Sequence, residues 1–457
     1  MTDVAPPATG RRALIGDLVA VAAGVVLVLL SSVDGWALIR AGQDIILGFP
    51  PLLATWMPHV GPGTPIAIVV AVLVATRGPG LAERLSWRPL LFLSWAAAFV
   101  WTFGLALVDG WQRGVVERLS SSQEYLNDVP KVGDIGEMLR TFSDHILTNQ
   151  PVFWTTHVGA HPPGAFLLFV WLDRIGLGGG GPAGVAVMLA GASACAAVAV
   201  TLRALGHEAT ARAVLPFSVL FPGAVWVGVS ADGVFAAVLA WGVALLAVGS
   251  ARRGPRADGA ALVGGVLLGY TLYLSYGLAL GGLLPLAVVA ARSLGGARVD
   301  AAPRPSRAVG FAVVGALAVA VAFTAAGFWW VTGYEDVKVI YAHSAAKDRP
   351  YSYFVWADLA ALVLATGPAV LAGLRRLVAS RRALPLAASL LVAAAAAAVL
   401  AADLSGLSKA EVERIWLPFG VWLLVACALL PRRHVRWWLV GQAVLALAVN
   451  HLLFTVW

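Results

Sequence analysis

Long runs of apolar residues separated by short polar segments extend along this chain from residue 13 to residue 455. Most runs approach the ~20 residues that a helix needs to cross the hydrocarbon core of a bilayer. The pattern therefore predicts an all-α, polytopic membrane protein with about 13 transmembrane helices. The expected spans are 13–32, 64–77, 89–108, 183–203, 213–227, 231–249, 259–274, 276–291, 309–331, 354–374, 383–402, 415–430 and 437–455.

The composition supports a membrane protein. Hydrophobic residues make up 60% of the chain and charged residues only 12%, which is more apolar surface than a soluble domain of this size buries. The net charge of +8 comes mostly from arginines in short runs between apolar segments, so it indicates a lipid bilayer rather than nucleic acid as the partner. Cys195 and Cys427 lie inside apolar segments and have no metal-ligand spacing.

The arginine runs predict the topology. One run precedes each odd-numbered expected span, so the positive-inside rule places the N-terminus in the cytoplasm, the C-terminus outside and the protein in the plasma membrane. The runs contain Arg11 and Arg12; Arg77, Arg84 and Arg88; Arg203 and Arg212; Arg252, Arg253 and Arg256; Arg292, Arg298, Arg304 and Arg307; Arg375, Arg376, Arg381 and Arg382; and Arg432, Arg433 and Arg436.

This alternation holds only if the apolar segment 161–175 does not cross the membrane. The segment is short for a span, because Asp173 and Arg174 follow only about a dozen apolar residues. We therefore expect it to lie on the outer face, at the end of a long external loop over 109–182. The moderate amphipathic pattern of that loop predicts two or three interfacial helices.

Three regions follow from this topology. Residues 1–86 form an N-terminal pair of spans, and 87–300 form a central module that includes the external loop 109–182. Residues 301–457 add further spans with external loops at 332–353 and 403–414. The sequence has no GxxxxGK[ST] motif, which argues against ATP-driven transport.

Two acids stand at the external ends of spans. Asp109 ends the third span, where it is either an ordinary helix-end residue or a base or metal ligand at the mouth of a cavity. Asp232 lies in the turn VSADGVFA, where Ser230 or Asp232 could cap the next helix, or where the helix N-terminus could help to position a ligand.

His157 and His161 are four residues apart and are followed by Pro162 and Pro163. Two histidines at this spacing can share a metal on one helix face, but two ligands alone are weak evidence for zinc and the prolines disfavour a regular helix. We expect His161 to bind substrate or form hydrogen bonds, and His157 to be structural.

Cationic and aromatic residues cluster in the last two external loops. Arg414, in KAEVERIW, could pair with Glu411 or Asp403, or could hold a lipid phosphate at the outer membrane edge. Lys347 and Arg349 form a second cationic pair. Tyr351 is either a substrate contact or part of the interfacial aromatic belt.

The order of these features resembles the GT-C superfamily of membrane glycosyltransferases. The resemblance starts with the acid after an early span (Asp109) and a long external loop that ends in HPPG at 161–164. The turn LFPGAVWVGVSADGVFA at 220–236 is similar to one in protein O-mannosyltransferases, aminoarabinose transferases and the oligosaccharyltransferase catalytic subunit. The segment 265–288 resembles the hairpin of that family. The chain differs in having no second acid beside Asp109, no arginine before Asp232 and no lysine in the hairpin.

This resemblance implies a function on the external face. A sugar such as mannose or arabinose would move from a polyprenyl-phosphate-linked donor to an envelope glycan, glycolipid or protein. Asp109 would be the base, and Asp232 would support the acceptor. Asp109 and Asp232 would be the ligands of any Mg²⁺ or Mn²⁺. The expected substrate-binding residues are Glu124, Tyr125, His161, Asp232, Lys347, Arg349, Tyr351 and Arg414, the cationic ones holding the lipid phosphate. The alternative is a polytopic transporter or lipid flippase, which would have paired charges within its spans.

Overall fold

The structure is a computed structural model of the chain, and it describes residues 10–295, 305–380 and 384–456. Four arginines of the basic loops, Arg298, Arg304, Arg381 and Arg382, lie outside the described residues. The expected boundary between the second and third regions, at 300/301, also lies outside them.

Helices form nearly all of the described chain. The longer ones are α1 (Arg11–Arg40), α2 (Gly63–Arg84), α3 (Trp87–Ala106), α7 (Gly180–Ala192), α8 (Ala194–Ala204), α9 (Glu208–Val219), α11 (Ala231–Ala251), α12 (Pro255–Leu274), α13 (Leu283–Gly295), α14 (Ser306–Ala325), α15 (Trp330–His343), α17 (Tyr351–Thr366), α18 (Pro368–Ala379), α19 (Leu386–Ser405) and α22 (Val435–Leu452). The shorter ones are α4 (Ile135–Arg140), α5 (Thr156–Gly159), α6 (Pro163–Arg174), α10 (Ala224–Val227), α16 (Ala345–Asp348), α20 (Val412–Ile415) and α21 (Leu417–Leu423).

Nine helices of the described part are long and apolar enough to cross a membrane. They are Arg11–Arg40, Gly63–Arg84, Trp87–Asp109, Gly180–Ala204, Ala231–Ala251, Pro255–Leu274, Tyr276–Leu294, Ser306–Ala325 and Leu386–Ser405. A bent pair, α17 and α18, makes a tenth candidate. The expected all-α, multi-pass membrane protein is therefore confirmed, whereas the full number of expected spans is not. The expected spans 213–227, 415–430 and 437–455 have no uninterrupted counterpart among the nine.

The break between α17 and α18 has a local cause. The two helices meet at an angle of 108°, at Gly367, whose φ of +86° disfavours any other residue. Pro368 then starts the new helix, where its missing N–H is harmless. The side-chain amide of Gln442 on α22 bonds the backbone groups that the break leaves without helical partners. Its nitrogen donates to the Thr366 carbonyl (2.9 Å), and its oxygen accepts from the Ala369 N–H (3.2 Å).

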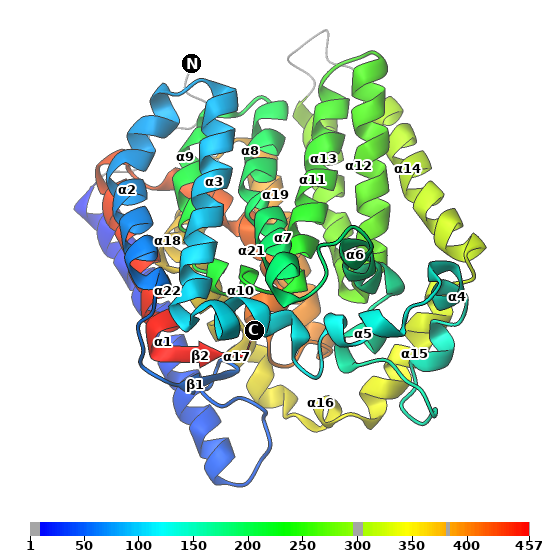
Figure 1. Cartoon of the computed structure of the whole chain (residues 1–457). Helices are drawn as coiled ribbons and strands as arrows, with labels where there is room; N and C mark the ends of the chain where they lie inside the picture. The colour runs from blue at the N-terminus through cyan, green and yellow to red at the C-terminus, as the bar shows by residue number, and fades with distance from the viewer. Residues whose placement is uncertain (1–9, 296–304, 381–383, 457) are drawn as a thin grey trace.

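The segment 161–175 contains α6, a helix of only 12 residues. Such a helix is about 18 Å long, well short of the ~30 Å hydrocarbon core, in agreement with the charge pattern. The loop over 109–182, for which two or three helices were expected, contains α4, α5 and α6 together with several short 3₁₀ and π-helical turns. The N-cap residue of α4, Asp134, accepts a hydrogen bond from the N–H of Glu137 at 2.7 Å. Figure 1 shows α4, α5, α6, α15 and α16 gathered at one end of the bundle.

A small two-stranded sheet, which the sequence pattern does not indicate, lies at this same end (Figure 1). Strand β1 (Ala54–Trp56) pairs antiparallel with β2 (Leu453–Thr455), with Ala54 opposite Thr455. The pair ties the loop after α1 to the last residues of the chain. The expected final span 437–455 therefore ends as a helix at Leu452 and continues as a strand.

Candidate functional site

Arg414 is the centre of a buried polar network at the end of the bundle. It lies in α20 and is only 7% exposed. Its Nη1 donates to Oδ2 of Asp232 at 2.7 Å, and its Nη2 donates to Oε2 of Glu411 at 2.5 Å. The same Nη2 lies 3.1 Å from Nε2 of His157. One guanidinium thus connects α11, the loop before α20 and the long segment between α3 and α6.

His157 lies between Arg414 and Glu124. An arginine nitrogen can only donate, so Nε2 of His157 is the acceptor in the contact with Arg414. Nδ1 lies 2.9 Å from Oε1 of Glu124. Glu124, His157, Arg414 and Asp232 therefore form one continuous series of polar contacts.

Aromatic rings enclose this series of polar contacts on the side of α6. The Tyr125 ring stacks on Phe169 of α6 with centroids 4.8 Å apart, and it lies within about 6 Å of the rings of His157 and His161. Tyr125 is fully buried, and burial, followed by the charge of Glu124, raises the pKa of its hydroxyl. Tyr125 is therefore a neutral phenol at physiological pH.

His161 presents one ring nitrogen with a lone pair. Its Nδ1 donates to the carbonyl of His157 at 2.8 Å. Burial, followed by the neighbouring His157, lowers the pKa of His161 to about 4, so the ring is neutral at pH 7. In a neutral ring whose Nδ1 donates, Nε2 is an acceptor. This geometry agrees with the hydrogen-bonding role expected for His161 and would suit a substrate hydroxyl.

The HPPG sequence places His161 by fixing the start of α6. Pro162 has an extended backbone and Pro163 occupies the first helical position, where proline is favoured. Gly164 lies directly against α12: a Cβ there would be 2.5 Å from the carbonyl oxygen of Tyr273. The hydroxyl of Tyr270 donates to the Gly164 carbonyl at 2.8 Å. Only glycine allows α6 to approach α12 this closely.

Asp232 is in the first turn of α11 and is 5% exposed. The capping role considered for Ser230 or Asp232 is not observed. Ser230 occupies the N-cap position without a side-chain cap, because its hydroxyl donates backwards to the Trp226 carbonyl at 2.7 Å. The Asp232 carboxylate instead binds Arg414 at 2.7 Å, near the positive end of the α11 dipole.

Carboxylates outnumber cations in this network. Glu124, Asp232 and Glu411 all act electrostatically on Arg414. Glu413, beside Arg414, is 1% exposed, and burial raises its pKa to about 7. Nη1 of Arg414 already donates to Asp232, and Nη2 already contacts Glu411 and His157. A centre with more carboxylates than cations suits a neutral hydroxyl or a cationic group better than an additional anion such as a phosphate.

Asp109 belongs to a separate network. Its Oδ1 lies 2.8 Å from Nε2 of His59 and its Oδ2 accepts from Nη2 of Arg118 at 2.8 Å. Arg118 also donates to the carbonyl of Thr455 in β2, and its guanidinium lies 4.8 Å from the ring centroid of Phe454. Asp109 thereby holds together the loop after α1, the start of the long segment between α3 and α6, and strand β2.

Lys347, Arg349 and Tyr351 form a third group, which is tied to the loop before α20. The Lys409 ammonium donates to the carbonyls of Lys347 (2.7 Å) and Arg349 (2.9 Å). Arg349 donates in return to the Lys409 carbonyl at 2.6 Å. The hydroxyl of Tyr351 donates to the Leu404 carbonyl at 3.3 Å. The Lys347 side chain is exposed.

The structure thus brings together five of the expected residues: Glu124, Tyr125, His161, Asp232 and Arg414. Within the described ranges, no hydrogen bond or ion pair connects Asp109 with Asp232, and no cluster of three or more His, Cys, Asp or Glu residues is arranged to hold a metal ion. Each of the two proposed metal ligands is paired with an arginine instead.

Sequence reasoning missed several members of these networks. His59 and Arg118 were not expected, and His157 was assigned only a structural role. Lys409 and Glu413 were interpreted as an ordinary surface ion pair, whereas Lys409 binds the Lys347 and Arg349 carbonyls and Glu413 is buried. No local signal could have found the central contact, because His157 and Arg414 are 257 residues apart. The pairing of Glu411 with Arg414, three residues apart, was one of the alternatives, and it is observed.

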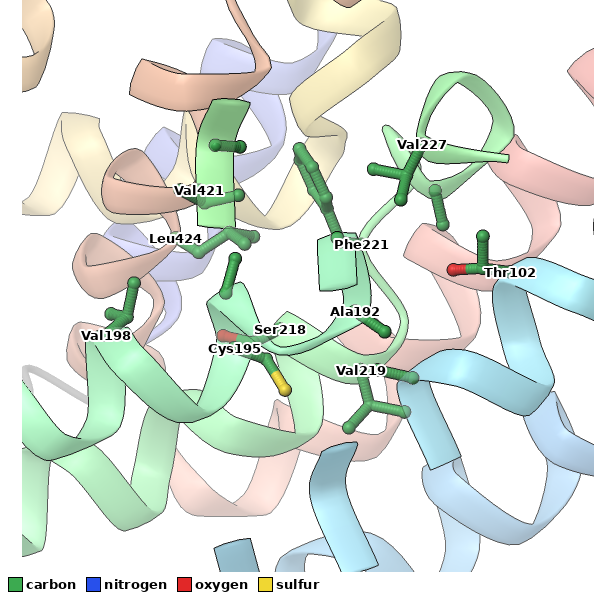
Figure 2. Close-up of a pocket in the computed structure, with 15 residues that line it drawn as sticks. Thr102, Ala192, Cys195, Val198, Ser218, Val219, Phe221, Val227, Val421 and Leu424 are labelled. Carbon is green, nitrogen blue, oxygen red and sulfur yellow. The ribbon is translucent and has the colours of Figure 1, made fainter. Parts of the chain in front are cut away.

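An apolar pocket elsewhere in the bundle is too small for a sugar. It measures about 30 Å³ and lies among α3, α7, α8, α9 and α21. Figure 2 shows Thr102, Cys195 and Ser218 among the mainly apolar side chains around it. Such a volume holds about one water molecule.

Comparison with models of known protein families finds no match for this chain, and comparison with curated proteins finds none either. The geometry of the polar networks is therefore the basis for a functional proposal.

Proposed function

We propose that this protein is an integral-membrane glycosyltransferase of the GT-C type, which transfers a sugar from a polyprenyl-phosphate donor to an envelope glycan, glycolipid or protein. The observation that carries the proposal is the chain of contacts from Glu124 through His157 and Arg414 to Asp232. It is buried beneath short helices at one end of the bundle, where a lipid-linked donor could enter from the bilayer. Ionisable groups in such a place are functional candidates, because desolvating them is costly.

We place this end of the bundle on the external face, as the arginine pattern predicts. The broken helix α9 with α10, the apolar helix Leu417–Leu429 that begins with α21, and the continuous helix α22 would then complete about 13 crossings. The N-terminus would be cytoplasmic and the C-terminus external, in the plasma membrane.

Glu124 is the general base in this proposal. A base needs a lone pair within reach of the acceptor hydroxyl. Glu124 has the His157 imidazole at 2.9 Å as its neighbour, whereas both oxygens of Asp109 are held at 2.8 Å by His59 and Arg118. The role of base expected for Asp109 stays a competing prediction, which variants of the two acids distinguish.

The reaction is a single displacement. The acceptor hydroxyl gives its proton to the Glu124 carboxylate while its oxygen forms a bond to C1 of the sugar. The bond between C1 and the phosphate oxygen breaks, and the electron pair leaves with the polyprenyl phosphate. Because this leaving group is already activated, the reaction needs neither a nucleotide nor an energy-coupling motif.

The departing phosphate is assigned to the cationic group of Lys347, Arg349 and Lys409. Arg414 is less suited to it, because Arg414 is already paired with Asp232 and Glu411. Arg414 instead orients Asp232, which with His161 and Tyr125 would receive the acceptor. Tyr351 would contact the donor beside the cationic group. Lys409 precedes Arg414 by five residues, so the two regions flank each other along one loop.

The test is a transfer assay with purified protein in lipid nanodiscs and radiolabelled polyprenyl-phospho-mannose or polyprenyl-phospho-arabinose. Donor consumption that is lost in Glu124→Gln supports the proposal. Normal transfer by Glu124→Gln and loss in Asp109→Asn would return the base to Asp109. Movement of the intact lipid across liposomes, without release of polyprenyl phosphate, would favour the transporter or flippase.

A further inference from the structure

An apolar groove opens on the opposite end of the bundle from the polar network. It lies between α2, α3 and α9, and its volume is about 280 Å³. Leu73, Leu81 and Leu93 on its walls are 40–55% exposed, so the groove is open at the outer surface of the protein. Because α2 and α3 are candidate spans, that surface faces the bilayer.

Short side chains explain why the groove is there. Gly78, Ala82 and Ala97 line it, together with Pro216 of α9. A Cβ on Gly78 would be 3.5 Å from Cβ of Pro216, so α2 and α9 approach each other at this glycine. The neighbouring small residues leave the space beside that contact unfilled.

Arg77 is the charged residue at the groove. It is exposed and lies seven residues before the end of α2, about 10 Å along the helix axis. Within the described part of the chain, Arg77 makes no hydrogen bond or ion pair. By contrast, Arg203 and Arg212 both pair with Glu208. An arginine at this depth in a span needs an anionic partner or access to the interface.

We propose that the groove binds one acyl chain of an anionic phospholipid whose phosphate pairs with Arg77. The apolar walls fit a hydrocarbon chain, and the unpaired guanidinium at the rim fits the headgroup charge. Basic pockets between spans at the arginine-rich end are typical sites for anionic lipids. The occupant is a membrane phospholipid rather than the sugar carrier, because the groove lies at the other end of the bundle from the proposed reaction centre.

Native mass spectrometry of delipidated, purified full-length protein tests the contact between the lipid headgroup and Arg77. We expect phosphatidylglycerol to bind about five-fold more tightly than phosphatidylcholine, the effect of one favourable lipid–arginine contact. Arg77→Gln should abolish that preference. Arg253→Gln, which removes an exposed arginine from the same end, should keep it. Equal binding of the two lipids, or an unchanged preference in Arg77→Gln, would overturn the proposal.

A second variant tests whether the acyl chain lies in the groove. Ala97→Phe fills the groove without changing charge, and it should reduce the number of phosphatidylglycerol molecules retained, with size-exclusion behaviour checked first. Undiminished retention would mean that the acyl chain lies elsewhere. Polyprenyl phosphate is the competing probe: displacement of phosphatidylglycerol at equal concentration would make the carrier lipid the occupant and contradict the assignment. These outcomes do not depend on glycosyl transfer.

Discussion

His157 and Arg414 are separated by 257 residues in the chain and by 3.1 Å in the structure, with Nε2 of the imidazole facing Nη2 of the guanidinium. Nδ1 of the same imidazole lies 2.9 Å from Oε1 of Glu124. A change at His157 therefore acts on Glu124 and Arg414 at once.

Replacing His157 tests this coupling. His157→Phe keeps a ring beside Tyr125 but removes both nitrogens, so Glu124 and Arg414 each lose a buried partner. If the network is the reaction centre, the turnover rate of sugar transfer should fall by about 100-fold, the low end of the range for acid–base groups. His157→Gln, which retains a donor and an acceptor, should lose less.

The control for His157 is His343→Phe, which changes an exposed histidine on α15. It should leave transfer unchanged. Equal rates in His157→Phe and the wild type would show that the chemistry lies outside this network.

The ion pairs of Asp109 predict a loss of stability. Asp109→Ala leaves Arg118, which is 6% exposed, without its acidic partner, and releases His59. Breaking a buried pair by removing one member costs roughly 3 kcal/mol. Thermal unfolding in detergent should show a clear decrease in Tm. Asp258→Ala, which removes an exposed pair with Arg307, should show little change. An unaltered Tm in Asp109→Ala would contradict the structural role.

Much of the fold is predictable because apolar length is read directly from the sequence. The run expected at 231–249 is the helix Ala231–Ala251, and the run at 183–203 lies within Gly180–Ala204. The breaks were missed although their signals are present: Gly367 and Pro368 interrupt one apolar run, and Pro222 and Gly223 interrupt another. An average over an apolar window hides single residues that change the backbone direction.

Some members of the site were predictable, but their arrangement was not. Asp232 and Arg414 were singled out because charged residues at the membrane edge are costly to desolvate and are therefore functional candidates. Their 2.7 Å contact could not be inferred, since it depends on how α20 packs beside α11. The β1–β2 pair is a similar case, because three-residue strands at opposite ends of the chain have no local pattern.

Glu413 predicts a dependence of stability on pH. Burial raises its pKa from the usual 4.5 to about 7. Between these values the folded protein keeps a proton that the unfolded chain releases, so stability falls as pH rises from about 4.5 to about 7 and stays reduced above it. Glu413→Gln removes this effect and should be more stable than the wild type at pH 8, by at most roughly 3 kcal/mol.

The measurement is Tm of both proteins from pH 4 to pH 8. The advantage of Glu413→Gln should disappear towards pH 4. Glu335→Gln, on the exposed face of α15, is the matched control and should follow the wild type. A constant difference between Glu413→Gln and the wild type at every pH would show that Glu413 does not titrate in this range.

Gly164 connects the packing of α6 to the position of His161. A methyl group there would lie 2.5 Å from the carbonyl oxygen of Tyr273, a backbone atom that cannot move aside alone. Gly164→Ala should therefore push the start of α6 away from α12 and shift His161, three residues earlier, relative to Tyr125. Transfer should fall at least ten-fold, and Tm should decrease, because overpacking typically costs about 1–3 kcal/mol.

Gly310→Ala is the control, since nothing lies within 4 Å of a Cβ at that position of α14 and alanine is the better helix former. Full activity and an unchanged Tm in Gly164→Ala would mean that α6 tolerates the displacement and that HPPG does not set the geometry of the site.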